Sequence, residues 1–202
     1  MAQEGTGSNE TRSMDERALA SLVGMLSGAS RKDRQSSAHT ISQIAQANPE
    51  VLVPYIDNLV DAIDRPEAQT RWEVLDALSS VCSVDPEGAK RASEGAEEAL
   101  YDEESGMLRA TAFRFFSKLA ATSQENAAQI WPLLDEALQC FHGDPEYLGM
   151  LEDVANLLES GCVDARTRGE IASRVKFDAQ NGKGRLASFS KRIIDLCGRE
   201  GD

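Results

Sequence analysis

Histidine and cysteine are the first residues to consider, because they bind metal ions and catalyse reactions at neutral pH. The chain has only two histidines, His39 and His142, and they lie far apart in the sequence. Cys140 is two residues from His142, but at the end of a helix two such side chains point in different directions. No spacing in the chain matches a zinc site. The sequence therefore predicts neither a metal site nor a cofactor.

Nucleophilic catalysis is not indicated either. No G-x-S-x-G pattern occurs, and Cys82 and Cys197 fall in a column of buried helix positions, where a thiol fills volume. The glycine-rich turn at 181–184 lacks the preceding strand and the following Ser or Thr of a phosphate-binding loop. The acidic run 94–104 has the pattern of a helix, so we interpret it as a solvated acidic face and not as a calcium loop. We expect no enzyme activity.

Composition and charge narrow the function classes further. The net charge is −13, which disfavours binding to a nucleic-acid backbone. Hydrophobic residues make up 41% of the chain and aromatic residues only 5%, a balance typical of packed helices. No apolar run is long enough to span a membrane, and the polar N-terminus does not resemble an export signal. The sequence predicts a cytoplasmic protein that does not bind membranes.

Nearly the whole chain has a helical pattern from Met14 onward, so any functional side chains must be positioned by helices. Residues 1–12 are polar and are predicted to form a disordered tail. The remaining sequence divides into ten helices in five pairs. They are expected at 14–27, 32–47, 49–63, 67–83, 87–101, 106–122, 125–141, 145–160, 164–179 and 184–197.

The second helix of each pair repeats at a nearly constant period. If Arg34, Arg71, Arg109 and Tyr147 are taken as equivalent, the spacings are 37, 38 and 38 residues. Apolar or small residues recur 4, 7, 10 and 11 positions after each of these anchors. Those offsets lie on one side of an α-helix, so each second helix should bury one stripe. The column at offset 7 contains Ile41, Leu78, Phe116 and Val154, and Ile193 continues it in the last unit.

Three segments of the second unit resemble HEAT repeats. They are the first-helix pattern "PEVLVPYIDNLVDAID", the turn "DRPEAQTR" and the second-helix stripe "RWEVLDALSSV". Armadillo arrays are a close alternative. The resemblance covers one repeat domain, residues 13–199, and implies an all-α, right-handed α-α superhelix (solenoid) of about five helical pairs. The units are expected near 14–48, 49–85, 86–124, 125–161 and 162–199.

The repeated arginines point close to the buried direction of their helices, so they are not ordinary surface charges. The HEAT resemblance implies that each pairs with a turn aspartate and that the pairs form a ladder between units. The candidate pairs are Arg71 with Asp64 and Arg109 with Asp102 or Glu103, and Arg34 holds the equivalent position in the first unit.

A partner is expected to bind the concave side, which the second helices line in arrays of this kind. Offsets 1, 5 and 9 point away from the core there, and they present a band of mixed charge with two apolar residues. An alternative for the tryptophan in this band is that it folds back against the neighbouring unit. The candidate partner-binding residues are Trp72, Asp76, Arg114, Lys118, Leu148 and Glu152.

The function that these observations favour is a non-enzymatic scaffold that binds a partner protein, with nucleic acid an unlikely partner. The alternative is a HEAT-like enzyme or DNA-binding module, similar to alkylpurine glycosylases or bilin lyases. Glycosylases of this architecture need a basic groove for DNA, and the acidic composition of the chain does not provide one.

Overall fold

The computed structural model describes the backbone of residues 5–199 and the side chains of residues 15–199. That part of the chain contains helices and no strand. In chain order the elements are α1 (Gly5–Met25), α2 (Arg31–Ala47), the 3-10 helix η1 (Pro49–Tyr55), α3 (Ile56–Ala62), α4 (Ala68–Val81), α5 (Pro86–Lys90), α6 (Ser93–Leu100), α7 (Gly106–Ala120), α8 (Gln124–Cys140), α9 (Tyr147–Glu159), α10 (Ala165–Asn181) and α11 (Gly184–Cys197).

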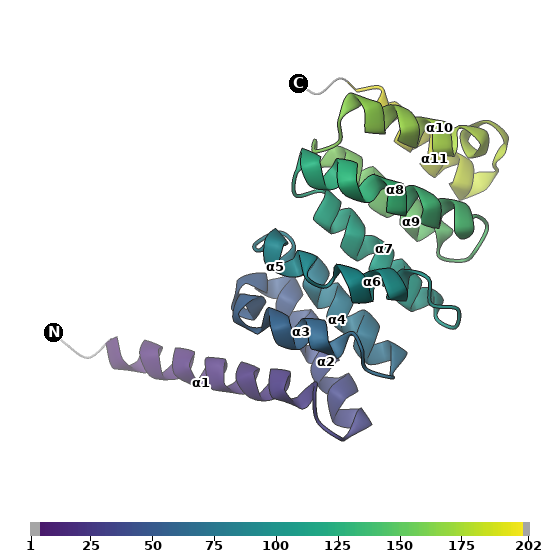
Figure 1. The fold of residues 1–202 in the computed structure, drawn as a ribbon. Helices are drawn as coiled ribbons and strands as arrows, with labels where there is room; N and C mark the ends of the chain where they lie inside the picture. The colour runs from purple at the N-terminus through teal and green to yellow at the C-terminus, as the bar shows by residue number, and fades with distance from the viewer. Residues whose placement is uncertain (1–4, 200–202) are drawn as a thin grey trace.

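The helices form two layers that extend along one axis (Figure 1). The second helices pack side by side in the order α2, α4, α7, α9 and α11, while α3, α6, α8 and α10 lie in the other layer. Helix α1 extends away from the array at its N-terminal end (Figure 1). None of the helices between Gly5 and Arg199 combines the length and apolar character that crossing a lipid bilayer requires.

One continuous hydrophobic core runs between the layers, from Leu19 in α1 to Leu196 in α11. The predicted stripe at offset 7 is confirmed, because every member of it is buried. Their exposed fractions are Ile41 0%, Leu78 0%, Phe116 3%, Val154 0% and Ile193 0%.

Side-chain caps explain where several helices begin. Ser30, Ser105 and Ser123 each accept a hydrogen bond from the backbone N–H three residues later, at the start of α2, α7 and α8. Asp164 does the same for α10. Each such cap satisfies an N–H that the helix itself leaves unpaired, and is worth about 1 kcal/mol.

Two first helices differ from their predicted form. The segment 49–63 begins as the 3-10 helix η1, with Pro54 inside it, and only then becomes α3. The segment 87–101 is divided into α5 and α6. A Cβ on Gly88 would lie 2.5 Å from Ile56 Cδ1, and a Cβ on Gly95 would lie 2.9 Å from Ile63 Cγ2. These glycines therefore let α5 and α6 approach the preceding unit closely.

The N-terminal boundary also differs from the prediction. Residues 1–4 of the expected tail lie outside the described residues, and α1 begins at Gly5. From Gly5 to residue 12 the structure therefore has a helix where the sequence predicts a disordered tail.

Candidate partner-binding surface

The repeated arginines bind consecutive units to one another. In the first turn of α4, Arg71 donates from Nε to the carbonyl of Ile63, at 2.9 Å, and its Nη1 lies 3.1 Å from Asp102 Oδ2. Arg109 holds the equivalent position in α7, and its Nη1 donates to the carbonyl of Asp102 at 2.8 Å. Asp102 therefore offers its carboxylate to the arginine of the preceding unit and its carbonyl to the arginine of its own unit.

The same arrangement recurs on both sides of this junction. Each guanidinium binds a carbonyl of its own turn and a carboxylate of the next turn, with the charge-assisted bonds that a planar fork favours. The other members are Arg34, with the carbonyl of Gly28 at 2.7 Å and the carboxylate of Glu67, and Arg109, with the carboxylate of Glu146 at 2.6 Å. The hydrogen bond from Arg34 also holds the pKa of Glu67 below its usual value.

This geometry corrects the expected pairs. Arg71 takes Asp102 as its carboxylate partner in place of Asp64, and Arg109 takes Glu146 in place of the carboxylates of Asp102 or Glu103. The difference follows from the length of the arginine side chain. The guanidinium extends past its own turn, where it binds only a backbone carbonyl, and ends beside the turn of the following unit.

At the next junction a tyrosine and a histidine, both bound to Asp178, take the place of the arginine. Tyr147 donates from its hydroxyl to Asp178 Oδ2 at 3.1 Å, and His142 Nε2 lies 3.0 Å from Asp178 Oδ1. The two rings also contact each other edge to face, with centroids 4.8 Å apart. Burial and the neighbouring Asp178 raise the pKa of the Tyr147 hydroxyl, so it stays protonated and donates.

Further along the same second helices, polar side chains link one helix to the next. Asp76 on α4 accepts hydrogen bonds from Ser42 at 2.7 Å and from Gln46 at 2.9 Å, both on α2. Arg114 on α7 lies between two carboxylates, with 3.9 Å from Nη1 to Asp76 Oδ1 and 3.5 Å from Nε to Asp153 Oδ1 on α9. A chain of polar contacts thus crosses four consecutive helices.

Asp153 is the most perturbed carboxyl in this chain of contacts. Its side chain is buried, and burial raises its pKa to about 6 against the partial compensation of Arg114. The Asp153 carboxyl therefore takes up a proton at a higher pH than an ordinary aspartate. The attraction between Arg114 and this carboxyl strengthens as the pH rises through that value.

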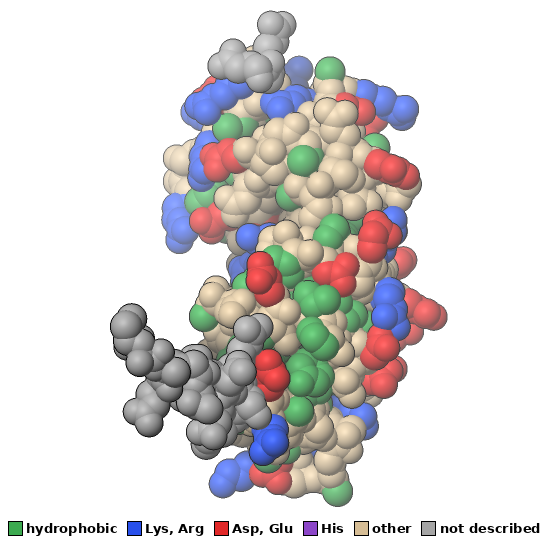
Figure 2. Space-filling view, turned by 90° about the vertical axis from the view of Figure 1, so that its left-hand side faces the viewer, with side chains coloured by type: hydrophobic (Ala, Val, Ile, Leu, Met, Phe, Trp, Pro, Cys, Tyr) green, Lys and Arg blue, Asp and Glu red, His purple; other side chains and the backbone are tan. Residues whose placement is uncertain are grey.

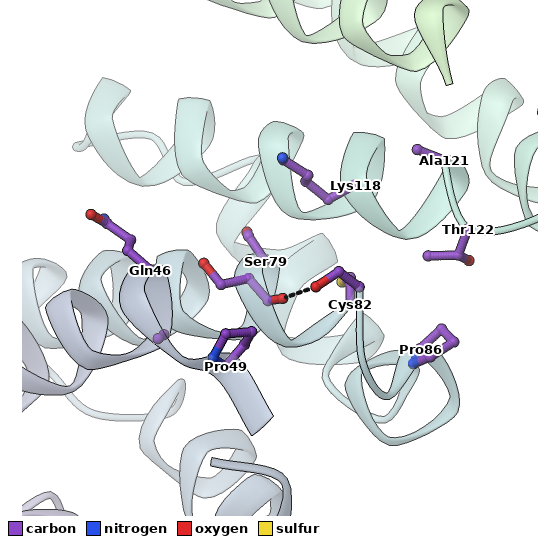
Figure 3. Close-up of a pocket in the computed structure, with 11 residues that line it drawn as sticks. Gln46, Pro49, Ser79, Cys82, Pro86, Lys118, Ala121 and Thr122 are labelled. Carbon is purple, nitrogen blue, oxygen red and sulfur yellow. Dashed lines mark hydrogen bonds between the residues drawn. The ribbon is translucent and has the colours of Figure 1, made fainter. Parts of the chain in front are cut away.

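Two charged side chains on the same layer are left available. Lys118 on α7 and Glu152 on α9 are exposed, and neither forms an ion pair with another described residue. Lys118 lies at a pocket of about 530 Å³ near the ends of α2, α4 and α7, together with Gln46 and Cys82 (Figure 3). In Figure 2 the side formed by the second helices is hollowed at mid-height.

The two apolar candidates are only partly accessible. Trp72 on α4 and Leu148 on α9 are half-buried, and both pack against the core. The structure therefore brings Asp76 and Arg114 together and leaves Lys118 exposed beside them on α7. The side chain of Trp72 packs partly against the core and is partly exposed to solvent.

Sequence reasoning missed Asp153. It stands at offset 6, which belongs to neither the buried stripe nor the outward set. The same offset holds Thr40 in α2, Ala77 in α4 and Phe115 in α7, so the column is mixed and only the two middle units suggest that it is buried. Glu73, at offset 2, was also missed: its side chain is buried, and its Oε1 lies 2.9 Å from His39 Nδ1.

Two of the four thiols, Cys82 and Cys197, lie where a reactive nucleophile is not expected. Burial raises the pKa of Cys82 to about 12 and that of Cys197 to about 11, so both remain protonated at neutral pH. Among the described residues, no three His, Cys, Asp or Glu side chains are grouped so that they could hold a metal ion.

Comparison with known proteins identifies the architecture. No protein-family model matches the chain, and a search of curated proteins finds no similar sequence. Among solved structures, an engineered protein matches with a TM-score of 0.62 and 17% identity, over 89% of this chain and 98% of that one. A designed armadillo repeat protein matches with a TM-score of 0.58 and 13% identity, over 89% and 100%. The chain has an armadillo/HEAT-like helical-repeat fold.

A second designed armadillo repeat protein, solved in complex with peptide (KR)4, matches with a TM-score of 0.56 and 15% identity, over 89% of this chain and 99% of that one. At these identities the matches establish the fold alone. The predicted all-α, right-handed α-α superhelix is confirmed.

Proposed function

We propose that this protein is a non-enzymatic scaffold that binds an extended or helical segment of a partner protein along the concave layer of α2, α4, α7, α9 and α11. The observation that carries the proposal is the chain of contacts from Asp76 through Arg114 to Asp153, with Lys118 and Glu152 exposed beside it. Such a surface is polar, charged and internally braced.

The contacts of Arg114 and the free charges beside it determine which partner segments this surface should prefer. Arg114 is held by two carboxylates, so it needs little further ordering when a partner arrives. Lys118 and Glu152 keep their charges free to meet opposite charges on the partner. A segment of mixed charge fits this pattern better than a uniformly charged one.

An apolar anchor is proposed at the edge of the same surface. Trp72 and Leu148 keep part of their side chains accessible on α4 and α9. Aromatic residues that are braced by packing often contribute strongly to interfaces, because they lose little conformational freedom on binding. The solved neighbour in complex with peptide (KR)4 supports the general idea that this fold can hold a peptide.

The alternative DNA-binding or enzymatic function has less support. Arg114, Lys118 and Arg192 on this layer are accompanied by at least as many carboxylates, among them Asp76, Asp153 and Glu159. A groove that follows a phosphate backbone needs a clear excess of positive charge.

The test is capture of partner proteins from a lysate of the source organism on the immobilised chain. The informative variant is the double reversal Lys118→Glu with Glu152→Lys, which keeps the net charge. Its control is Lys176→Glu with Glu94→Lys, a matched reversal of exposed residues on the first helices. We expect the first variant to lose the partner and the control to retain it. Retention by both would reject the concave surface, and duplex-DNA binding that weakens steeply with salt would favour the alternative.

A further inference from the structure

A second surface lies at the N-terminal end of the array, away from Lys118. A groove of about 970 Å³ opens between α1 on one side and the end of α2 with η1 on the other. Its floor includes Leu22, Ile44, Val51 and Tyr55, all of them half-buried. Figure 2 shows hydrophobic side chains gathered on this face of the molecule.

The groove exists because α1 leaves the array. Toward its C-terminal end α1 buries Leu19 and Val23 in the core, whereas Asp15 and Ala18 are exposed. The N-terminal part of α1 extends away from the other helices (Figure 1). Opposite α1, the chain forms the 3-10 helix η1, which contains Pro54. The apolar surface between them is thus left open by the backbone path of both segments.

The charged side chains that line the groove are acidic. Asp15 on α1 and Glu50 on η1 are exposed at its rim, and no Lys or Arg is among its described lining residues. An apolar floor with acidic edges is complementary to an amphipathic helix that carries Lys or Arg beside its apolar face. The volume exceeds that of one side chain and suits several residues spaced at i, i+3, i+4 and i+7.

We infer that this groove is a docking site for a basic amphipathic helix of a partner protein. It is separate from the concave surface and does not depend on it. The apolar floor supplies the affinity, and the rim carboxylates select a basic partner over an acidic one.

The probe for this site is a fluorescent peptide of about 14 residues, made of Leu and Lys with the leucines on one helical face. A scrambled peptide of the same composition has no apolar face, and a Leu/Glu peptide has the opposite charge. We expect the Leu/Lys peptide to bind the full chain at least tenfold more tightly than either control.

Three substitutions test whether the Leu/Lys peptide binds in this groove. Leu22→Glu puts a charge on the floor, and the peptide should bind this variant at least tenfold more weakly. Glu50→Lys changes only the exposed rim, so it tests the site even if Leu22→Glu fails to fold, and it should weaken binding several-fold. Glu94→Lys makes the same charge change on α6, and it should leave binding unchanged.

Three results would overturn the inference. Equal weakening by Glu94→Lys and Glu50→Lys would mean diffuse attraction to an acidic protein. Equal binding of the scrambled peptide would mean that no helical face is recognised. A concentration-dependent dimer, seen in sedimentation and abolished by Leu22→Glu, would mean that a second copy of the chain occupies the groove.

Discussion

Arg71 Nη1 lies 3.1 Å from Asp102 Oδ2, so an arginine in the first turn of the second helix of one unit is bound to the turn that precedes the second helix of the next. Three successive junctions share this relation, with Arg34 and Glu67 before it and Arg109 and Glu146 after it. Stability in such an array depends on contacts between neighbours. The arginine ladder should therefore contribute to cooperativity along the chain.

The ladder predicts a large effect of losing one guanidinium. Arg109→Met leaves the carboxylate of Glu146, with 7% side-chain exposure, without its cation. We expect a loss of about 3 kcal/mol in the free energy of unfolding, measured by urea titration. Arg166→Met is the control, because Arg166 and Glu170 form an exposed pair worth about 0.5 kcal/mol or less. Similar losses for both variants would contradict a structural role for the ladder.

The core stripe makes a second prediction. Leu78→Ala and Phe116→Ala each remove a buried side chain and should lower the free energy of unfolding by about 2–5 kcal/mol. Gln43→Ala, on the exposed side of α2, should change it by about 0.5 kcal/mol or less. Thermal or urea unfolding measures all three, and comparable losses would show that the stripe is misplaced.

The buried carboxyl predicts a pH dependence. The pKa of Asp153 is raised from 3.8 to about 6 in the folded state, so between these values the folded chain binds more protons than the unfolded chain. Asp153 therefore lowers stability as the pH rises through this window. Asp153→Asn removes this pH dependence. The free energy of unfolding of the variant, relative to that of the wild type, should therefore rise by about 2 kcal/mol from pH 4 to pH 7. A constant difference between the two proteins across that range, in urea titrations, would count against the burial of this group.

The thiol of Cys140 should react before that of Cys82. Cys140 is exposed, whereas Cys82 is buried with a pKa raised to about 12. A chromogenic disulfide reagent at pH 8 should modify Cys140 quickly and Cys82 only after denaturant is added. The fast phase should disappear in Cys140→Ser. Rapid modification of Cys82 in the folded protein would contradict its place in the core.

The sequence predicted the features that depend on one helix at a time. Ile41, Leu78 and Phe116 recur at a fixed offset, and a 3.6-residue period is enough to place them on a buried face. The positions of the arginines followed from the same period.

Features that depend on how units meet were harder to predict. The choice of Asp102 over Asp64 is set by where the turn of one unit lies beside the helix of the previous one. The close approach of α5 and α6 to the preceding unit, at Gly88 and Gly95, is likewise a contact between units. Asp153 pairs with Arg114 through the stacking of α7 on α9, which a single helical wheel does not contain.

Binding of a partner to the concave layer is tested most directly by the dissociation constant of a captured partner for the variant Trp72→Ala with Arg114→Ala, measured by calorimetry. Circular dichroism should first confirm that this variant is folded, because Trp72 also packs against the core. We predict that the dissociation constant rises at least tenfold, which corresponds to about 1.4 kcal/mol. An unchanged dissociation constant in the folded variant would contradict the assignment of partner binding to this surface.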